Sequence, residues 1–131
     1  MLRFPPNYWW RSDTKLCLEE FTLITLFLRY TIDPNKLSDI AKYAADEQVP
    51  IRESGGKILG YFMPTDFAGA TNEAIGLIDF PSLAEYELYR AKLAAHPLHK
   101  KYVEVLEGTG ALLSIHRSLV QRVESSLEQE S

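Results

Sequence analysis

Cysteine is almost absent from this chain. Cys17 is the single cysteine among 131 residues, so neither an intramolecular disulfide framework nor a thiolate zinc cluster can form within the chain. A lone cysteine fits a reducing compartment, and we expect a cytoplasmic protein. No recognisable base lies beside Cys17 in the sequence, so a nucleophilic role is not predicted for it.

A long apolar run is missing as well. Residues 23–28 form the longest one, and Thr25 interrupts it, whereas a membrane-spanning helix needs about 20 apolar residues. The first twenty residues contain two prolines and a Trp9-Trp10 pair, without the apolar segment of a secretory signal. We therefore expect no membrane partner and interpret residues 1–20 as an extended arm.

The chain also lacks an excess of basic charge. Its 14 lysines and arginines are outnumbered by 18 aspartates and glutamates, and the two signs are interspersed, unlike the basic surface of a nucleic-acid binder. We expect no nucleic-acid partner. Hydrophobic residues make up 46% of the chain, which is enough for one domain with a core. We place this domain at residues 21–120, followed by a polar tail at 121–131.

What the sequence does contain is apolar segments with the two-residue period of β-strands. Four of them are predicted, and in each of them both parities are largely apolar, as in strands that are covered on both sides. The loop at residues 64–71 joins the second and third strands and is longer than a usual hairpin connection. The predicted strands are residues 21–32, 57–63, 72–80 and 111–120.

Helical segments lie between these strands. The first begins at Asp33, which offers an N-cap oxygen, and Pro34, which suits the first helical position. Pro50 is expected to kink this helix or to begin a new turn. The second helix begins at the capping residue Ser82, and Pro97 begins a shorter one after it. The first helix has an apolar side of Leu37, Ile40, Ala41 and Ala44 and a predicted solvent side of Asp39, Lys42, Asp46 and Glu47.

This order of elements predicts an α+β protein. The series β-α-β-β-α-β gives a ferredoxin-like, four-stranded antiparallel sheet with both helices on one face. The other face is also apolar and needs a cover in a soluble protein. A second copy placed sheet to sheet would supply it, forming a dimeric α/β barrel across an isologous interface. The alternative is that the arm with Trp9 and Trp10 covers this face.

Several short segments carry a recognisable pattern. Residues 50–53 (PIRE) lead to residues 55–62 (GGKILGYF), and residues 30–32 (YTI) precede Pro34. Over about residues 24–120 the chain resembles the NIPSNAP family, whose members form a dimeric α/β barrel. The resemblance implies this fold and a homodimer, and it implies no particular reaction. Further matching positions are Lys36, Gly69, Asn72, Ser82, Leu83, Arg90, Leu93 and Pro97.

The sequence departs from the family pattern on three strands. Leu26 and Leu28 stand where the family often has an acidic residue and an arginine, residues 76–78 (GLI) replace a His-Leu-Trp triplet, and His116 stands where a glutamate is common. From the parity of these departures we infer which residues face the barrel interior, and we predict a mainly apolar cavity beside Gly76. The alternative is an interior filled by side chains. The predicted ligand-binding residues are Leu26, Leu28, Tyr61, Asn72, Ala74, Gly76, Ile78 and Ser114.

His116 and Tyr30 are the predicted catalytic residues of this cavity. Imidazole transfers protons near neutral pH, although a histidine on a strand can also be a purely structural donor. His96 and His99 have the spacing of a metal-binding pair, but no third ligand accompanies them, and we predict no metal site. No glycine-rich loop precedes a helix, so no cofactor is predicted.

Two interpretations of function remain open. In the first, the chain is a binding or interaction module that holds a small apolar or aromatic ligand in its cavity. In the second, it is a cofactor-independent monooxygenase or isomerase for a small aromatic or polyketide-like substrate, in which His116 or Tyr30 takes a proton while the cavity excludes water. The second interpretation is an analogy at the level of the fold.

Overall fold

The computed structural model describes residues 23–123. The predicted arm at residues 1–20 and most of the predicted tail lie outside this range. Within it, no helix is both long and apolar enough to cross a membrane. The elements in chain order are β1 (Ile24–Ile32), the 3-10 helix η2 (Pro34–Lys36), α2 (Leu37–Glu53), β2 (Lys57–Phe62), β3 (Glu73–Phe80), α3 (Leu83–Ala95), α4 (Pro97–Thr109) and β4 (Leu112–Val120).

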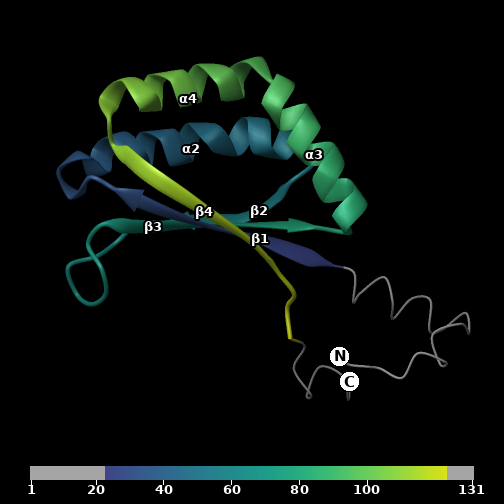
Figure 1. Ribbon diagram of the computed structural model, residues 1–131, viewed down its shortest axis with the longest axis horizontal. Coiled ribbons are helices and arrows are strands. Elements are labelled where there is room, and N and C mark those ends of the chain that lie inside the picture. Colours follow the sequence, from purple (N-terminus) through teal and green to yellow (C-terminus); the bar gives the residue numbers. More distant parts are fainter. Residues whose placement is uncertain (1–22, 124–131) are drawn as a thin grey trace, which may run out of the picture.

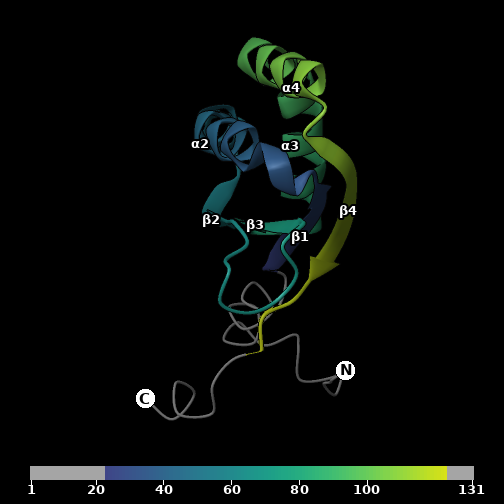
Figure 2. The same ribbon diagram turned by 90° about the vertical axis from the view of Figure 1, so that its left-hand side faces the viewer.

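The four strands form one antiparallel sheet in the order β2-β3-β1-β4. All three α-helices lie on the same side of this sheet, and α2 and α4 run beside each other (Figures 1 and 2). The predicted ferredoxin-like fold is confirmed. The second helical segment is divided into α3 and α4, because His96 takes an extended backbone conformation immediately before Pro97.

Short polar side chains and glycines set the helix ends. Asp33 Oδ1 accepts a hydrogen bond from the backbone N–H of Asn35 at 2.9 Å, and Ser82 Oγ accepts one from the backbone N–H of Glu85 at 3.2 Å. Gly110 ends α4 with a φ of 71°, a left-handed conformation that glycine adopts without a steric penalty. These caps explain why the predicted starts lie within a few residues of the observed ones.

Pro50 does not end α2. The helix runs on to Glu53, and Pro50 lies in its last turn. A proline there removes one hydrogen bond to the preceding turn, while its fully buried ring packs into the interior of the domain. The expected new turn after this proline is therefore wrong.

The core lies between the sheet and the helices. β1 contributes Leu26, Leu28, Tyr30 and Ile32, all buried. An aromatic group closes one end of this layer, where the rings of Phe80 and Tyr89 have centroids 4.6 Å apart. The remaining core residues are Ile40, Ile51, Ala74, Ile78, Leu106 and Ala111.

The opposite face of the sheet, which we call the open face, is not covered by any helix of residues 23–123 (Figure 2). Apolar side chains lie at its centre. Cross-strand pairing aligns Phe27 with Leu77 and places Phe62 beside Ile75. Phe27, Ile75 and Leu77 are half-buried, and Phe62 is 50% exposed. The expectation that both faces of the sheet are apolar is confirmed at these positions.

One end of the open face is polar. Asp79 is buried there and is satisfied from two sides, because Thr25 Oγ1 donates to its Oδ1 at 2.5 Å and Arg122 lies 3.1 Å from its Oδ2. These two contacts offset the free-energy cost of removing the Asp79 carboxylate from water.

Candidate functional site

A cavity of about 120 Å³ lies between the sheet and the helices, on the face opposite to the open face. We call it the helix-side cavity. Its walls come from β1, β2, β4 and all three α-helices, and they combine apolar side chains with tyrosines and charged groups. The lining residues are Leu26, Leu28, Tyr30, Tyr43, Glu47, Ile51, Tyr61, Tyr89, Arg90, Leu93, Ala94, His99, Ile115 and Arg117.

The carboxylate of Glu47 is the most unusual group in this wall. Its side chain is only 2% exposed. Oε2 accepts hydrogen bonds from Nδ1 of His99 on α4 and from the Tyr43 hydroxyl, the latter at 3.3 Å. Oε1 is buried and has no hydrogen-bond partner among the described residues. A buried oxygen without a partner costs free energy unless a bound molecule supplies a donor.

Glu47 reaches this place because α2 repeats its inward positions every three or four residues. Ile40, Ala44, Glu47 and Ile51 are all buried, and they follow the i, i+4, i+7, i+11 spacing of one helix face. Tyr43 precedes Glu47 by four residues, which places the two side chains side by side.

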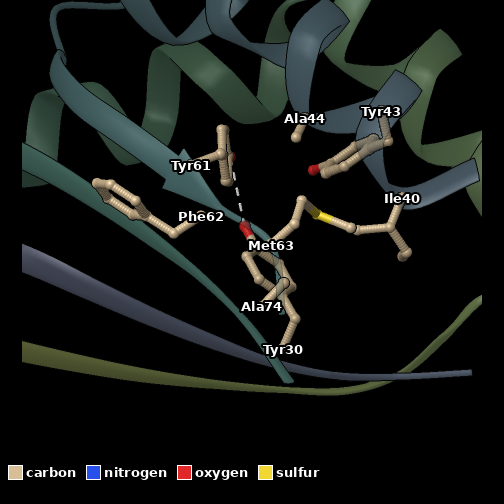
Figure 3. A pocket seen from close by; sticks show the side chains of 8 residues that line it. All are labelled: Tyr30, Ile40, Tyr43, Ala44, Tyr61, Phe62, Met63 and Ala74. Carbon is tan, nitrogen blue, oxygen red and sulfur yellow. Dashed lines mark hydrogen bonds between the residues drawn. The ribbon is translucent and has the colours of Figure 1, made fainter. Parts of the chain in front are cut away.

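Tyrosine hydroxyls form the second polar group of the cavity. Those of Tyr30 and Tyr61 lie 3.3 Å apart, and Figure 3 shows the Tyr43 hydroxyl directed toward the same interior. Burial raises the pKa of Tyr30 to about 12 and raises the pKa of Tyr61 and of Tyr43 well above the usual value of 10. These hydroxyls therefore remain protonated at neutral pH and act as hydrogen-bond donors.

Two arginines provide positive charge at the edge of the cavity. Arg90 on α3 and Arg117 on β4 both line it and are both exposed. Arg90 also donates to the Tyr86 hydroxyl at 3.3 Å. The cavity thus has a buried carboxylate inside and guanidinium groups toward solvent.

A second, much smaller void of about 10 Å³ lies beside the first (Figure 3). Tyr30, Tyr43 and Tyr61 border both spaces. This volume is about that of one water-sized sphere, so it offers no room for an organic ligand. Its other lining residues are Ile40, Ala44, Phe62, Met63 and Ala74.

The structure brings part of the predicted site together, but on the helix side of the sheet and not on the open face, which would line a barrel formed by two sheets. Leu26, Leu28, Tyr30 and Tyr61 line the helix-side cavity. The remaining members on this side of the sheet contribute less. Ala74 borders the small void, Ile78 is completely buried in the core, and Asn72 is exposed before β3, where its carbonyl accepts a hydrogen bond from Ile32.

The assignment of Ser114 and His116 to the same face is wrong. In the sheet, Tyr30 pairs with Ile115 and Leu28 with Arg117, so the helix side of β4 carries the odd-numbered residues. The departures from the family pattern, from which the assignment was inferred, therefore do not all lie on one face of the sheet. β4 also contains a register shift. Ile32 pairs with Leu112, but Thr31 pairs with Ser114, so one extra residue is inserted in β4 and the alternation of side chains is inverted after it. His116 is exposed on the open face, opposite Arg29.

Gly76 does not open the cavity that the sequence suggested. It pairs with Tyr61 across β3 and β2, and a Cβ atom at position 76 would lie 2.7 Å from Cε1 of the Tyr61 ring. The tyrosine ring therefore occupies the space above the glycine. The empty space lies farther along, between this ring and the helices.

Sequence reasoning missed Glu47 and the role of His99. The charge pattern predicts Glu47 on the solvent side of α2. However, Glu47 lies three residues after Ala44 and seven after Ile40, and this spacing is that of the apolar side of the helix. His99 was considered only as a metal-binding partner of His96. In the structure each histidine contacts its own glutamate, His96 with Glu53 at 2.7 Å and His99 with Glu47.

The family model for NIPSNAP matches residues 25–127, which is most of the chain. This chain belongs to the NIPSNAP family. A comparison with curated proteins finds no match. The family match confirms the resemblance to NIPSNAP proteins that residues 50–62 and neighbouring positions carry.

Solved structures of NIPSNAP proteins share the fold. An uncharacterized NIPSNAP-like domain protein from Burkholderia xenovorans has 22% identity and a TM-score of 0.67, covering 79% of this chain and 88% of its own. A NIPSNAP family protein of unknown function from Agrobacterium tumefaciens has 18% identity and a TM-score of 0.69, covering 79% of this chain and 91% of its own.

A more distant match carries information about assembly. It is described as a dimeric protein of unknown function with a ferredoxin-like fold, from Bacteroides fragilis. It has 18% identity and a TM-score of 0.56, and it covers 77% of this chain and 97% of its own. At these identities the three structures establish the fold of the NIPSNAP chain and leave its activity to be inferred from the site.

Proposed function

We propose that this NIPSNAP chain binds a small organic molecule in the helix-side cavity. The observation that carries the proposal is the buried carboxylate of Glu47, which belongs to the lining of a cavity of about 120 Å³ and whose Oε1 has no hydrogen-bond partner among the described residues. Ligand sites typically combine an apolar lining with a few convergent polar groups. Here the leucines and tyrosine rings supply the apolar lining, and Glu47, His99 and the tyrosine hydroxyls supply the polar groups.

The site sets limits on its ligand. The volume suits a compact molecule, and the unpartnered carboxylate oxygen calls for a proton donor on it. The rings of Tyr30, Tyr61 and Tyr89 favour a flat or apolar body against them. This ligand differs from the one expected from the sequence, because it needs a polar group as well as an apolar or aromatic part.

A pair of alanine variants tests ligand binding. Ala94 lines the cavity from α3 and is exposed at its edge, whereas its neighbour Ala95 is also exposed but does not line it. Leucine at position 94 narrows the cavity without loss of a buried contact. We expect ligand-observed NMR with a library of small hydroxylated and carboxylated aromatic and aliphatic compounds to find binders of the unmodified chain that Ala94→Leu weakens at least about tenfold and Ala95→Leu does not. Equal binding by both variants, or the absence of any binder, would contradict the proposal.

A catalytic function is the second candidate, and Glu47 with His99 is the observation that favours it. A carboxylate held by an imidazole inside a cavity is an arrangement that can move a proton. In this candidate Tyr30 acts as a hydrogen-bond donor, since its raised pKa keeps it protonated. His116 has no part in it, because it lies on the other face of the sheet.

We also propose that two copies pair through their open faces. Phe27, Phe62, Ile75 and Leu77 give this face an apolar centre, and the helices of the described residues cover only the other side. Burial of such a face against a second copy is favoured by the hydrophobic effect. The dimeric description of the Bacteroides fragilis structure supports this pairing by analogy.

A further inference from the structure

We propose that Glu47 is a general base that moves a proton along the carbon chain of a small keto acid, so that the helix-side cavity is the active site of an isomerase or tautomerase. This inference rests on the proposed binding of a small molecule there. It adds a reaction, a substrate class and a role for each polar group of the wall.

The surroundings of Glu47 fit the task of a base. One carboxylate oxygen, Oε2, is held by His99 and Tyr43, which fixes the orientation of the group. The other oxygen, Oε1, has no hydrogen-bond partner among the described residues. A base must lie within hydrogen-bond reach of the proton that it takes, and Glu47 lies in the wall of the space that a substrate would occupy.

His99 positions this base and connects it to solvent. Its Nδ1–H donates to the carboxylate, and its side chain is 23% exposed whereas that of Glu47 is 2% exposed. The partly exposed imidazole therefore links the buried carboxylate to solvent.

The tyrosine hydroxyls can stabilise the negative charge that such a reaction creates. When a proton leaves the carbon next to a carbonyl group, negative charge develops on the carbonyl oxygen. Tyr30 and Tyr61 hold neighbouring hydroxyls in the same wall. One of them can donate to the other, and the remaining O–H can donate to the substrate oxygen. Fixed donors of this kind stabilise a developing oxyanion.

The chemical step is balanced without any further reactant. The Glu47 carboxylate takes a proton from the carbon beside the carbonyl, and the electron pair of the broken C–H bond forms a C=C bond as the C=O electrons move onto oxygen. The protonated Glu47 then returns the proton to oxygen or to another carbon of the same enolate. The product is an isomer of the substrate, and the base is regenerated.

The arginines point to an acid as the substrate. Arg90 and Arg117 line the outer part of the cavity from α3 and β4, and a guanidinium group binds a carboxylate with parallel hydrogen bonds. The substrate class that fits is a small keto acid, with its carboxylate toward the arginines and its acidic C–H toward Glu47.

Isotope exchange tests this reaction on the full chain. Pyruvate, 2-oxobutyrate and acetoacetate are incubated with the protein in D₂O, and the loss of their C–H signals is followed by proton NMR. We expect the unmodified chain to accelerate exchange of at least one of them, and Glu47→Gln to reduce the acceleration at least about 100-fold. The matched control is Glu53→Gln on the same helix, since Glu53 is 59% exposed and pairs with His96. It should leave the exchange rate unchanged.

Further variants guard against a loss of folding at the buried position. Tyr61→Phe keeps Glu47 and removes one donor, and we expect about a 100-fold loss, whereas Tyr102→Phe on α4, outside the cavity lining, should have no effect. His99→Asn keeps an N–H donor beside Glu47, whereas His99→Ala removes it. We expect His99→Asn to retain most of the exchange rate and His99→Ala to lose it, with KM for the keto acid unchanged in both.

Each outcome decides a different claim. Binding of a keto acid without exchange, or equal exchange by Glu47→Gln and the unmodified chain, overturns the proton-transfer role and leaves the binding proposal standing. If none of the keto acids binds, the substrate class is overturned. The comparison of Ala94→Leu with Ala95→Leu then decides separately whether the cavity binds small molecules at all.

Discussion

At the scale of single residues, the pairing of Gly76 with Tyr61 shapes the cavity. The Tyr61 ring lies against the backbone of β3 at Gly76, so close that it would meet a Cβ atom at this position. An aromatic ring placed across a strand glycine recovers packing that the glycine lacks. The same placement brings the Tyr61 hydroxyl to that of Tyr30. A glycine thus determines where a polar group of the site lies.

Gly76→Ala tests this packing. The added methyl group would lie 2.7 Å from the ring, so the ring must move toward the cavity, and we expect a loss of about 1–3 kcal/mol in the free energy of unfolding. Urea denaturation measures it. The control is Gly108→Ala, because no atom lies within 4 Å of the added methyl at this exposed position of α4. That variant should gain up to about 1 kcal/mol. Equal effects of the two variants would contradict the proposed packing.

The buried tyrosines make stability depend on alkaline pH. Tyr30 has a pKa raised from 10.0 to about 12 by burial, so between these pH values the folded chain holds a proton that the unfolded chain has released. The contribution of Tyr30 to the free energy of unfolding is therefore constant below about pH 10. The free energy of unfolding falls as the pH rises from there toward about 12.

We expect Tyr30→Phe to make this alkaline decline less steep. Phenylalanine has no proton to release, so the contribution of this position to the pH dependence disappears. Urea denaturation at several pH values between about 9 and about 11 measures the slope. Tyr102→Phe is the control, because it removes a tyrosine hydroxyl on α4 that lies outside the cavity lining, and it should leave the slope unchanged. Identical slopes in Tyr30→Phe and the unmodified chain would contradict the assignment.

At the scale of elements, the site depends on how α3 is held. α3 supplies Tyr89, Arg90, Leu93 and Ala94 to the cavity wall. Its first turn is capped by Ser82, whose Oγ accepts the backbone N–H of Glu85. This cap fixes the first turn of α3 and so helps to hold the cavity-lining residues of the helix in place.

Ser82→Ala should lower the free energy of unfolding by about 1 kcal/mol, since a helix N–H loses its acceptor. Ser82→Asp restores an acceptor and should retain most of the stability. Thermal denaturation followed by circular dichroism measures both variants. A stability of Ser82→Ala equal to that of the unmodified chain would show that the cap contributes nothing.

At the scale of the whole molecule, the open face is the main surface that the described helices leave uncovered. Its apolar centre at Phe27, Ile75 and Leu77 is bordered by the exposed ring of Phe62. The helix-side cavity lies on the other side of the sheet, so pairing of two sheets would leave its walls intact. The proposed binding and the proposed pairing would therefore use different faces of the same sheet.

We expect the chain to have twice its mass of 14.9 kDa in solution, and Leu77→Lys to give the single-chain mass. A lysine at the centre of the open face would have to bury its charge in the pairing surface, which is unfavourable. Light scattering at micromolar concentration measures the mass. Leu88→Lys is the control, because Leu88 is exposed on α3, and it should stay dimeric. A single-chain mass of the unmodified protein would contradict the pairing.

Most of the fold could be predicted because it depends on local patterns. The alternation in β1, the caps Asp33 and Ser82 and the restart at Pro97 are each set by neighbouring residues, and the structure places elements there. The face of His116 was wrong for another reason. Ile115 and Leu119 make the odd-numbered residues of β4 the more apolar set, and these face the helices. The departures from the family pattern gave the opposite assignment, because they do not lie on one face of the sheet.

The sequence by itself determined the order of elements, the two apolar faces of the sheet and the family. Only the tertiary structure decided which polar groups meet. Glu47 and His99 are 52 residues apart, and Tyr30 and Tyr61 are 31 apart. Their contacts depend on how α2 and α4 pack on the sheet and on the register of β2 against β3. Periodicity shows which side of an element faces inward, whereas the packing of different elements decides what each inward side chain touches.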